Sequence, residues 1–334
     1  MAKAIQSPAG SPHARILGVG GYRASRVVTN AEMCTMIDSS DEWIRTRTGI
    51  EERRWATAEE TVAVMAVAAA GKALADAGIG ADRIGCVLVS TVTHFGQTPS
   101  LAADVAARLG ADRAAAFDIS AACAGFCYGL TLAQDMVRGG SADHVLVIGV
   151  ERLSDLTDKT DRDTAFLFGD GAGAAVVGPS QTPAIGPVAW GADGRQLDAI
   201  DMTFTWDALR DRPDLGFPAL HMKGQQVFRW ASYEMVPVAR QALQNAGIEA
   251  ADLDAFIPHQ ANMRITDAMV KALKLPAHVP VARDVARTGN TSAASVPLAM
   301  ERMLEQGEAP HGGLALLIGF GAGLVYAAQV VVLP

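Results

Sequence analysis

The chain is poor in charge and in aromatic side chains. Only 19% of its 334 residues are charged and 6% are aromatic, whereas 50% are hydrophobic. Positive charge is in the minority, because 28 Lys and Arg residues stand against 36 Asp and Glu residues, for a net charge of −8. This balance argues against a nucleic-acid-binding protein, which needs a basic surface. The apolar fraction is enough for one large domain or two fused ones.

Cysteine is scarce, and its spacing argues against two further kinds of protein. The four cysteines are too sparse for a disulfide scaffold in a chain of this length. Cys123 and Cys127 could share one face of a helix, but no cluster of His or acidic residues accompanies them. We therefore expect no metal site. A reducing cytoplasm is the compartment that we expect for such a chain.

Segments that would direct the chain to a membrane are also missing from the pattern. Met1–Ser11 has no apolar run of the kind that a secretory signal peptide requires. Residues 314–334 carry no charge over a membrane-spanning length, but Gly319, Gly321 and Gly323 interrupt them before a β-branched run. We expect a strand, a glycine turn and a second strand there, and no membrane partner.

What the chain does contain is an internal repeat. Residues 72–81 and 241–250 are identical at six of ten positions. Ser120–Cys123 is similar to Ser292–Ser295, and Phe168–Gly173 is similar to Phe320–Gly323. These echoes occur in the same order, at offsets of 169, 172 and 152 residues. Three echoes in order indicate a duplication with halves of about 1–180 and 181–334.

The first half shows the alternation that is typical of an α/β protein. Its apolar strands read as continuous runs, as expected for sheets that are buried on both faces. Turn signals and helical periodicity separate these strands from one another. The pattern predicts helices near 62–77, 100–109 and 123–138, and strands near 84–91, 114–119 and 144–150.

Cys123 is the strongest candidate for chemistry. It follows an apolar strand and three small residues, and it opens the helix expected near 123–138. Free backbone N–H groups and the helix dipole at such a position favour the thiolate, which is the nucleophilic form. A lone cysteine is otherwise most often a small core residue. The repeat places Ser295 opposite Cys123, and this asymmetry favours a thiol that is used.

His259 and Asn290 are the expected partners of the thiol. His259 follows an apolar strand, and polar residues at such strand ends point toward the ligand crevice of an α/β sheet. Asn290 lies in a turn of small polar residues before a helix. Taken alone, His259 could be a structural histidine and Asn290 a turn residue or helix cap.

In combination, these segments resemble the β-ketoacyl-acyl carrier protein synthase III family of the thiolase fold. The resemblance runs from about Arg15 to Pro334. It rests on the motifs SSDEWIRTRTGI at 39–50, AACAGF at 121–126, FGDGAG at 168–173, HQAN at 259–262 and GNTSAAS at 289–295. The resemblance implies a five-layered αβαβα fold of two duplicated halves, a homodimer, and a catalytic set of Cys123, His259 and Asn290.

The resemblance also implies the reaction. Cys123 would take the acyl group from an acyl-CoA primer, and malonyl-acyl carrier protein would then lose CO₂ and attack the acyl-cysteine, in ping-pong order. The product would be a 3-oxoacyl-acyl carrier protein that starts fatty-acid or aromatic polyketide synthesis. His259 and Asn290 would donate hydrogen bonds to the enolate oxygen. No metal or organic cofactor is required.

Several further roles come from matching positions in the family. The backbone N–H groups of Cys123 and Ala322 would form the oxyanion hole; the family usually has Gly at position 322, and Ala fits there if its φ is negative. The residues expected to bind CoA are Trp43, Arg47, Arg162, Phe228 and Asn262. The walls of the acyl pocket are expected to include Leu153, Phe168, Leu220 and Met222, and Thr98 is expected to reach the pocket of the partner subunit.

A basic surface is the expected dock for the acidic carrier protein. The residues concerned are Arg264, Lys271 and Lys274, whose spacing puts them near one helical face, together with Arg229. Such a set is otherwise often a solvated helix face.

Three other functions stay open. The first is a starter-unit synthase of an aromatic polyketide pathway with the same site residues. The second is a thiolase-fold acyltransferase that transfers an acyl group without condensation, against which His259 and Asn290 argue. The third is a non-catalytic subunit that binds acyl-CoA or the carrier protein, against which Cys123 argues.

The size of residue 98 predicts the choice of primer. Members of the family that are restricted to acetyl primers carry Phe at the position of Thr98, and the smaller Thr leaves a larger pocket. We expect propionyl-, butyryl- and isobutyryl-CoA to be used as well as acetyl-CoA. Mass spectrometry of the products formed from malonyl-carrier protein and a panel of acyl-CoAs tests this, and use of acetyl-CoA alone would contradict it.

Overall fold

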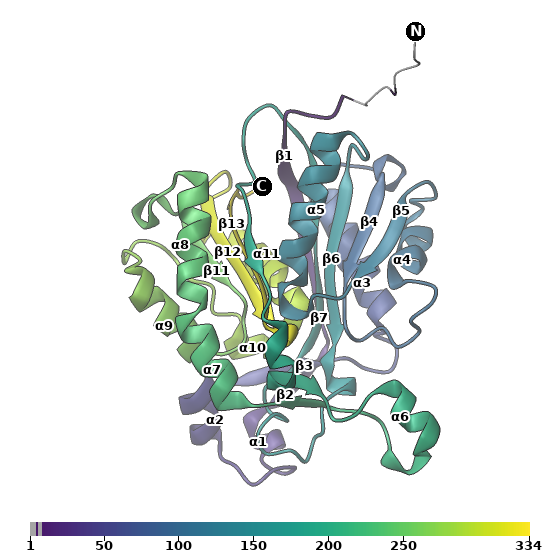
Figure 1. The fold of residues 1–334 in the computed structure, drawn as a ribbon, viewed down its shortest axis with the longest axis vertical. Coiled ribbons are helices and arrows are strands. Elements are labelled where there is room, and N and C mark those ends of the chain that lie inside the picture. Colours follow the sequence, from purple (N-terminus) through teal and green to yellow (C-terminus); the bar gives the residue numbers. More distant parts are fainter. Residues whose placement is uncertain (1–4, 6–8) are drawn as a thin grey trace.

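The computed structural model of the chain describes Ile5 and residues 9–334 (Figure 1). Most of the segment for which we expect no signal peptide therefore lies outside the described residues. Two sheets form the centre of the molecule, and each is built from one part of the chain. All strands of the larger sheet precede residue 181, and all strands of the smaller sheet follow it.

The larger sheet has five strands, in the order β1-β7-β6-β4-β5. Its β4–β5 and β4–β6 pairs are parallel, whereas the β1–β7 and β6–β7 pairs are antiparallel. The strands are β1 (His13–Arg23), β4 (Cys86–Ser90), β5 (Ala115–Ile119), β6 (Val145–Arg152) and β7 (Asp170–Ser180).

The smaller sheet repeats this arrangement. Its order is β11-β12-β13-β8, with β11–β12 parallel and the other two pairs antiparallel. A parallel bridge between Phe256 and Val281 stands where the larger sheet has β5. The strands are β8 (Ala189–Gly191), β11 (Ala255–Pro258), β12 (Leu314–Gly321) and β13 (Val325–Val332). This shared topology confirms two duplicated halves, while the exact boundary at residue 180 stays a prediction.

Helices form the other three layers. The central layer consists of α5 (Gly125–Gly139) and α11 (Ser295–Glu305), which contact strands of the larger and the smaller sheet. The layer outside the larger sheet contains α3 (Val62–Ala77) and α4 (Leu101–Leu109), and the layer outside the smaller sheet contains α8 (Met235–Ala246) and α9 (Met263–Leu273). The five-layered αβαβα fold is thereby confirmed (Figure 1).

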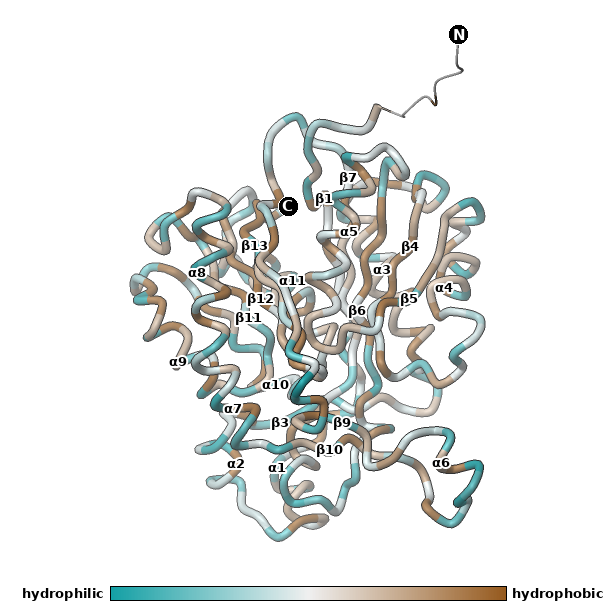
Figure 2. Tube along the Cα trace, viewed as in Figure 1, coloured by the Kyte–Doolittle hydropathy of each residue, from teal (hydrophilic) through white to brown (hydrophobic). Residues whose placement is uncertain are grey.

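Smaller elements lie at one end of the sheets (Figures 1 and 2). They are β2 (Arg26–Thr29), α1 (Asn30–Met33), α2 (Asp41–Thr48), β3 (Glu52–Trp55), β9 (Ile200–Met202), α6 (Trp206–Asp211), β10 (Leu220–Met222), α7 (Gly224–Tyr233) and α10 (Val285–Thr288). Part of this set packs in a core of its own, which includes Ile44, Trp55 and Phe166.

Local sequence explains the elements. Figure 2 shows the hydrophobic character of the central strands, and β4 is buried at all five positions. The side chain of Thr61 caps the start of α3, and Gly78 ends this helix in the left-handed conformation, as Gly247 ends α8. The six elements expected in the first half agree with the structure. Residues 314–334 form β12, a turn and β13, as expected.

The structure corrects the register of the second echo. Ala122 and Ser292 hold the same left-handed backbone, with φ of 43° and 47°, and each starts a short 3₁₀ turn before a central helix. The equivalent of Cys123 is therefore Ala293, and our inference from a Cys123–Ser295 asymmetry is wrong. Runs of Ser and Ala match at several registers, so identity of letters could not determine which residues are equivalent.

The third echo is also incidental. Phe168 precedes β7, whereas Phe320 lies near the end of β12, which occupies the position of β6 in the other half. The first echo does hold, because it covers the ends of α3 and α8 and their glycine caps.

Gly149 lets the two halves approach each other, and its substitution tests this contact. A Cβ at Gly149 of β6 would lie 2.2 Å from the carbonyl oxygen of Ala293. Because backbone atoms cannot move aside cheaply, we expect Gly149→Ala to lower the free energy of unfolding by about 1–3 kcal/mol. Gly71→Ala in α3, where nothing lies within 4 Å of the added Cβ, is the control and should raise it by about 0.5–1 kcal/mol. Denaturant titration of both variants measures the difference, and equal midpoints would contradict the close contact.

Candidate active site

Cys123 lies between the end of strand β5 of the larger sheet and the start of the central helix α5. It occupies the 3₁₀ turn Ala122–Ala124, directly before α5, and the turn starts with the positive φ of Ala122. Gly321 of the other half packs against it, since a Cβ at Gly321 would lie 3.0 Å from the sulfur and 2.9 Å from the backbone nitrogen of Cys123. The turn and the absent side chain together leave the thiol facing a cavity.

Burial decides the protonation of Cys123. It raises the pKa of the thiol to about 12, and the Glu151 carboxylate adds to the rise, whereas hydrogen bonds from Ser292 and from the backbone of Cys123 lower it. The backbone N–H group at the helix start does lower the pKa, as expected, but it does not lower it enough for the thiolate to form in the free protein. The desolvation of an anion outweighs the backbone N–H group at this site, and the thiol is protonated at neutral pH.

His259 follows β11 and is buried. Its Nδ1 lies 2.7 Å from the hydroxyl oxygen of Ser295, the first residue of α11, and its ring packs edge-on against Phe320 at 5.2 Å. The backbone N–H of Gln260 also donates to this hydroxyl oxygen, at 3.4 Å. Since Nδ1 of His259 is the one acceptor near the hydroxyl among the described residues, the Ser295 proton goes there and the imidazole carries its own proton on Nε2.

Asn290 is held by backbone on both sides. Its N–H donates to Leu167, its C=O accepts from Gly169, and its side-chain oxygen accepts from the N–H of Ser292 at 2.8 Å. The amide NH₂ group is thereby left to face the cavity that Asn290 lines. Gly289 precedes it with φ of 67°, which favours glycine, and a Cβ there would lie 2.8 Å from Cβ of Arg53.

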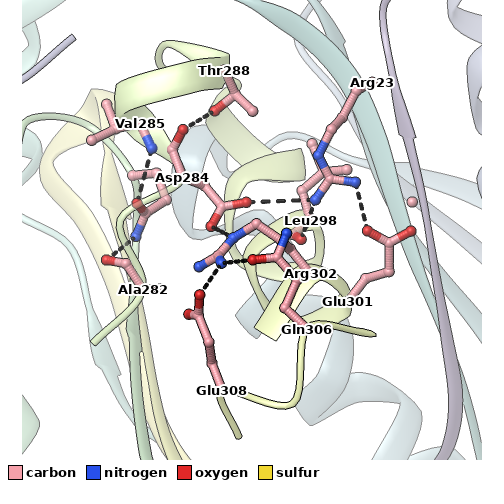
Figure 3. A network of polar contacts seen from close by, with 12 residues as sticks. Arg23, Ala282, Asp284, Val285, Thr288, Leu298, Glu301, Arg302, Gln306 and Glu308 are labelled. Atoms are coloured by element: carbon pink, nitrogen blue, oxygen red, sulfur yellow. Dashed lines mark hydrogen bonds and ion pairs between the residues drawn. The ribbon is translucent and has the colours of Figure 1, made fainter. Parts of the chain in front are cut away.

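A charged network supports the loop that carries Asn290 (Figure 3). Asp284 is buried and accepts from Arg302 of α11 at 2.6 Å and from Arg23 at the end of β1 at 3.5 Å. Arg23 also pairs with Glu301 at 2.6 Å. The side chain of Gln260 joins the same loop, accepting from the N–H of Val285 at 3.1 Å. Strand end, loop and helix are thus tied into one unit.

Cys123, His259 and Asn290 line one cavity of about 250 Å³. The structure therefore brings together the three residues that the sequence singled out. Four of the residues expected in the acyl pocket also line it, namely Leu153, Phe168, Leu220 and Met222. Thr98 is exposed and does not line the cavity of its own chain, in which Phe95 takes part instead; its expected role toward a partner subunit stays a prediction.

Other lining residues were missed by the sequence analysis. They include Val92, Ile200, Met202, Trp206 and Phe320. Trp206 begins α6 and packs against Phe95 and Phe217, both of which are exposed in part. The sequence around Trp206 has no regular apolar pattern, and it gave no reason to bring this residue near Cys123.

A second, open pocket of about 2040 Å³ adjoins the cavity, since Met222, Trp230 and Asn290 line both. Trp43, Arg47, Phe228 and Asn262 of the expected CoA site line it. The guanidinium carbons of Arg47 and Arg162 each lie 5.9 Å from the centre of the Trp43 ring. Asn262 caps α9 and donates to the carbonyl of Arg47 at 3.2 Å.

The expected carrier-protein residues are exposed. Arg229 and Arg264 line the open pocket, and the Arg264 guanidinium lies 4.8 Å from the centre of the Phe228 ring. Lys271 is on the last turn of α9, whereas Lys274 ends this helix in the left-handed conformation and so does not extend its face.

The backbone of Ala322 meets the condition for alanine at that position, because Ala322 is not among the described residues with positive φ.

Within residues 9–334 and Ile5, no cluster of His, Cys, Asp and Glu is arranged to bind a metal ion. No helix in the same residues has the length and apolar character to cross a membrane.

Comparisons with known proteins point to one family. Residues 117–194 match the family described as 3-oxoacyl-[acyl-carrier-protein (ACP)] synthase III, and residues 243–333 match the C-terminal part of that family. The chain is 65% identical over 340 residues to beta-ketoacyl-[acyl-carrier-protein] synthase III 1 of Streptomyces coelicolor, and 64% identical over 330 residues to the synthase III of Streptomyces glaucescens, with 99% of both chains covered in each case. The solved structure of the priming β-ketosynthase from the R1128 polyketide biosynthetic pathway matches with a TM-score of 0.97 and 53% identity, covering 99% of both chains.

The protonation of His259 is directly measurable. Burial lowers the pKa of its imidazole to about 3, so we expect the ring to stay neutral between pH 5 and 8 and to carry its proton on Nε2. Nitrogen NMR of ¹⁵N-histidine-labelled protein, with the signal assigned through His259→Gln, reports both properties. A titration midpoint near the ordinary value of 6.5, or a proton on Nδ1, would contradict the structure.

Proposed function

Because the chain belongs to the 3-oxoacyl-[acyl-carrier-protein] synthase III family, we propose that Cys123, His259 and Asn290 carry out the condensation that this family performs. The enzyme is a β-ketoacyl-acyl carrier protein synthase III, an acyl-transferring condensing enzyme of fatty-acid or polyketide initiation. The observation that carries the assignment of roles is the single cavity lined by the thiol, the imidazole and the side-chain amide.

In the first half-reaction, the sulfur of Cys123 attacks the thioester carbon of acyl-CoA. The carbonyl oxygen becomes an oxyanion, and the backbone N–H groups of Cys123 and Ala322 stabilise it. CoA leaves and the acyl group stays on Cys123. The acyl chain occupies the apolar cavity, with Leu153 and Phe168 among its walls.

In the second half-reaction, the malonyl thioester loses CO₂ and the electron pair of the broken C–C bond forms an enolate. His259 donates to the enolate oxygen through Nε2–H, and Asn290 donates through its NH₂ group. Ser295 supports the first donor by occupying Nδ1, and Ser292 supports the second by occupying the amide oxygen. The enolate carbon then attacks the acyl carbon, and the sulfur of Cys123 leaves.

The open pocket fits the rest of the substrates. Trp43 and Arg162 would hold the adenine of CoA, because a flat guanidinium and an indole both stack on a base. Arg47, Phe228 and Asn262 would contact the phosphates and the pantetheine arm along the same pocket. The exposed Arg229, Arg264, Lys271 and Lys274 would dock the acidic carrier protein, for which opposite charge is the expected attraction.

We propose further that the enzyme is a cytoplasmic homodimer that works without a metal or organic cofactor, with the functional halves meeting near residue 180. The edge strand β5 supports the dimer, because Phe117 on it is exposed and an unpaired edge is open to another strand. A propionyl, butyryl or isobutyryl primer follows from Thr98, provided that this residue reaches the cavity of the partner subunit.

Separate assays of the two half-reactions test these roles. Cys123→Ala should form no acyl-enzyme by intact-mass spectrometry, yet it should still decarboxylate malonyl-carrier protein. His259→Ala and Asn290→Ala should still be acylated, while each loses about 10²–10³-fold in decarboxylation because one enolate donor is missing.

The exposed His278 supplies a matched control, since His278→Ala removes an imidazole outside both pockets and should leave both half-reactions unchanged. Acylation of the Cys123→Ala variant would contradict the nucleophile. Full decarboxylation by His259→Ala together with Asn290→Ala would contradict the enolate site and favour acyl transfer without condensation.

A further inference from the structure

A buried carboxylate that the reaction described above does not use lies behind Cys123. Glu151 is on β6, and none of its surface is exposed. Its oxygens accept from the hydroxyl of Thr93 at 2.8 Å, from the hydroxyl of Thr91 at 3.2 Å and from the N–H of Val92 at 3.1 Å. No ion pair joins Glu151 to a cation in the part of the chain that the structure describes. A buried acid without a cation is costly, and it calls for a reason.

Ser292 connects this carboxylate to the reacting sulfur. Its hydroxyl donates to Oε1 of Glu151 at 3.1 Å, and Ser292 lies beside Cys123 in the wall of the same cavity, where it lowers the pKa of the thiol. A hydroxyl has one proton, so while that proton points at Glu151 the oxygen of Ser292 can only accept from the thiol. The S–H and O–H bonds then point in one direction, from Cys123 through Ser292 to Glu151.

The thiol needs such an acceptor. Its pKa of about 12 leaves it protonated, and attack on a thioester requires the proton to leave the sulfur. His259 is a poor base, because burial holds its pKa at about 3, and Nδ1 already accepts from Ser295. Among the described residues, Glu151 is the carboxylate that a single hydroxyl joins to Cys123.

We propose that Glu151 and Ser292 form a proton relay that deprotonates Cys123 during acylation and returns the proton when the product leaves. Ser292 lies next to the reacting sulfur and is catalytic in this step. Glu151 does not contact the sulfur and accepts the proton through Ser292, so it is a positioning residue. The inference rests on the proposed role of Cys123 as the acyl-carrying nucleophile and adds a path for its proton.

Protons and electrons balance over the cycle. The thiol proton passes to the oxygen of Ser292 as the hydroxyl proton passes to Oε1 of Glu151, which leaves a thiolate and a carboxylic acid. The thiolate electron pair forms the bond to the acyl carbon, and CoA departs with the electron pair of the broken C–S bond and takes a proton from water. After condensation, the C–S bond to Cys123 breaks, the thiolate is regenerated, and Glu151 returns the proton through Ser292.

The ionisation of Glu151 is consistent with this role. Burial raises the pKa of its carboxyl to about 7, and the hydrogen bonds from Val92, Thr93, Ser292 and Thr91 lower it. The groups that face it are thus hydroxyls and one amide from the 91–93 segment and from the turn at Ser292. Cys123 is the titratable group that it acts on electrostatically. An acid of this strength can accept a proton and give it back near neutral pH.

The test is the pH dependence of acylation in the full-length enzyme. Rapid quench and intact-mass spectrometry give the rate of acyl-Cys123 formation from propionyl-CoA between pH 5.5 and 9. The wild-type rate should fall as pH drops through about 7, because Glu151 is then already protonated. In Glu151→Gln the rate should be lower by about 10²–10³-fold at pH 8, and the inflection near pH 7 should vanish. Ser292→Ala should behave alike, because it breaks the path and keeps the acid.

Thr93→Val is the matched control. It removes one hydrogen bond to Glu151 but leaves the carboxylate and Ser292 in place, so the inflection should remain and move to higher pH. Thermal melts establish which variants are folded. If Glu151→Gln does not fold, Ser292→Ala still tests the relay. Two outcomes are distinguishable failures: a wild type that forms no acyl-Cys123 overturns the proposed function, whereas an acylated wild type whose pH profile is shared by Ser292→Ala overturns the relay.

Discussion

The Cys123 thiol and the His259 imidazole line one buried cavity, and desolvation shifts the pKa values of these two groups in opposite directions. It raises the pKa of Cys123 and lowers that of His259, so the two meet as neutral groups and no thiolate–imidazolium pair forms at rest. Proton positions must then be set by hydrogen bonds from neighbours, and Ser295, Ser292 and the backbone supply them.

Both halves of the fold contribute residues to the one site. Cys123 lies in the turn before the central helix α5 of the first half, whereas His259 and Asn290 come from a strand end and a turn of the second. The two halves can meet this closely because Gly149 and Gly321 present no side chain where backbone from the other half passes. The buried Asp284 network then fixes the loop before Asn290 to α11 and to the end of β1 (Figure 3). Rigid support of this kind is what keeps hydrogen-bond donors aimed during a reaction.

Apolar periodicity and helix-start residues are local signals, and they predicted the element positions of the first half. The five layers and the set of Cys123, His259 and Asn290 came instead from the motifs that the chain shares with a known family. Protonation could not be predicted in the same way, because the pKa of Cys123 depends on atoms from both halves that surround the sulfur. Glu151 escaped notice for a related reason, since a carboxylate at a strand end reads as a surface residue until Thr91, Thr93 and Ser292 are seen around it. Trp206 and Phe95 likewise reach the cavity through loops whose paths no periodic pattern encodes.

The matched turns at Ala122 and Ser292 have one more consequence. Two identical chains related by a two-fold axis must place the same side chain at both turns, so neither can become the counterpart of the other. Joining the copies in one polypeptide removes that restriction. One turn then carries a methyl group beside the sulfur and the other a hydroxyl, on the same left-handed backbone. The two turns thus keep one backbone geometry but present different side chains. A repeated structural unit can in this way contribute two different groups to a single cavity.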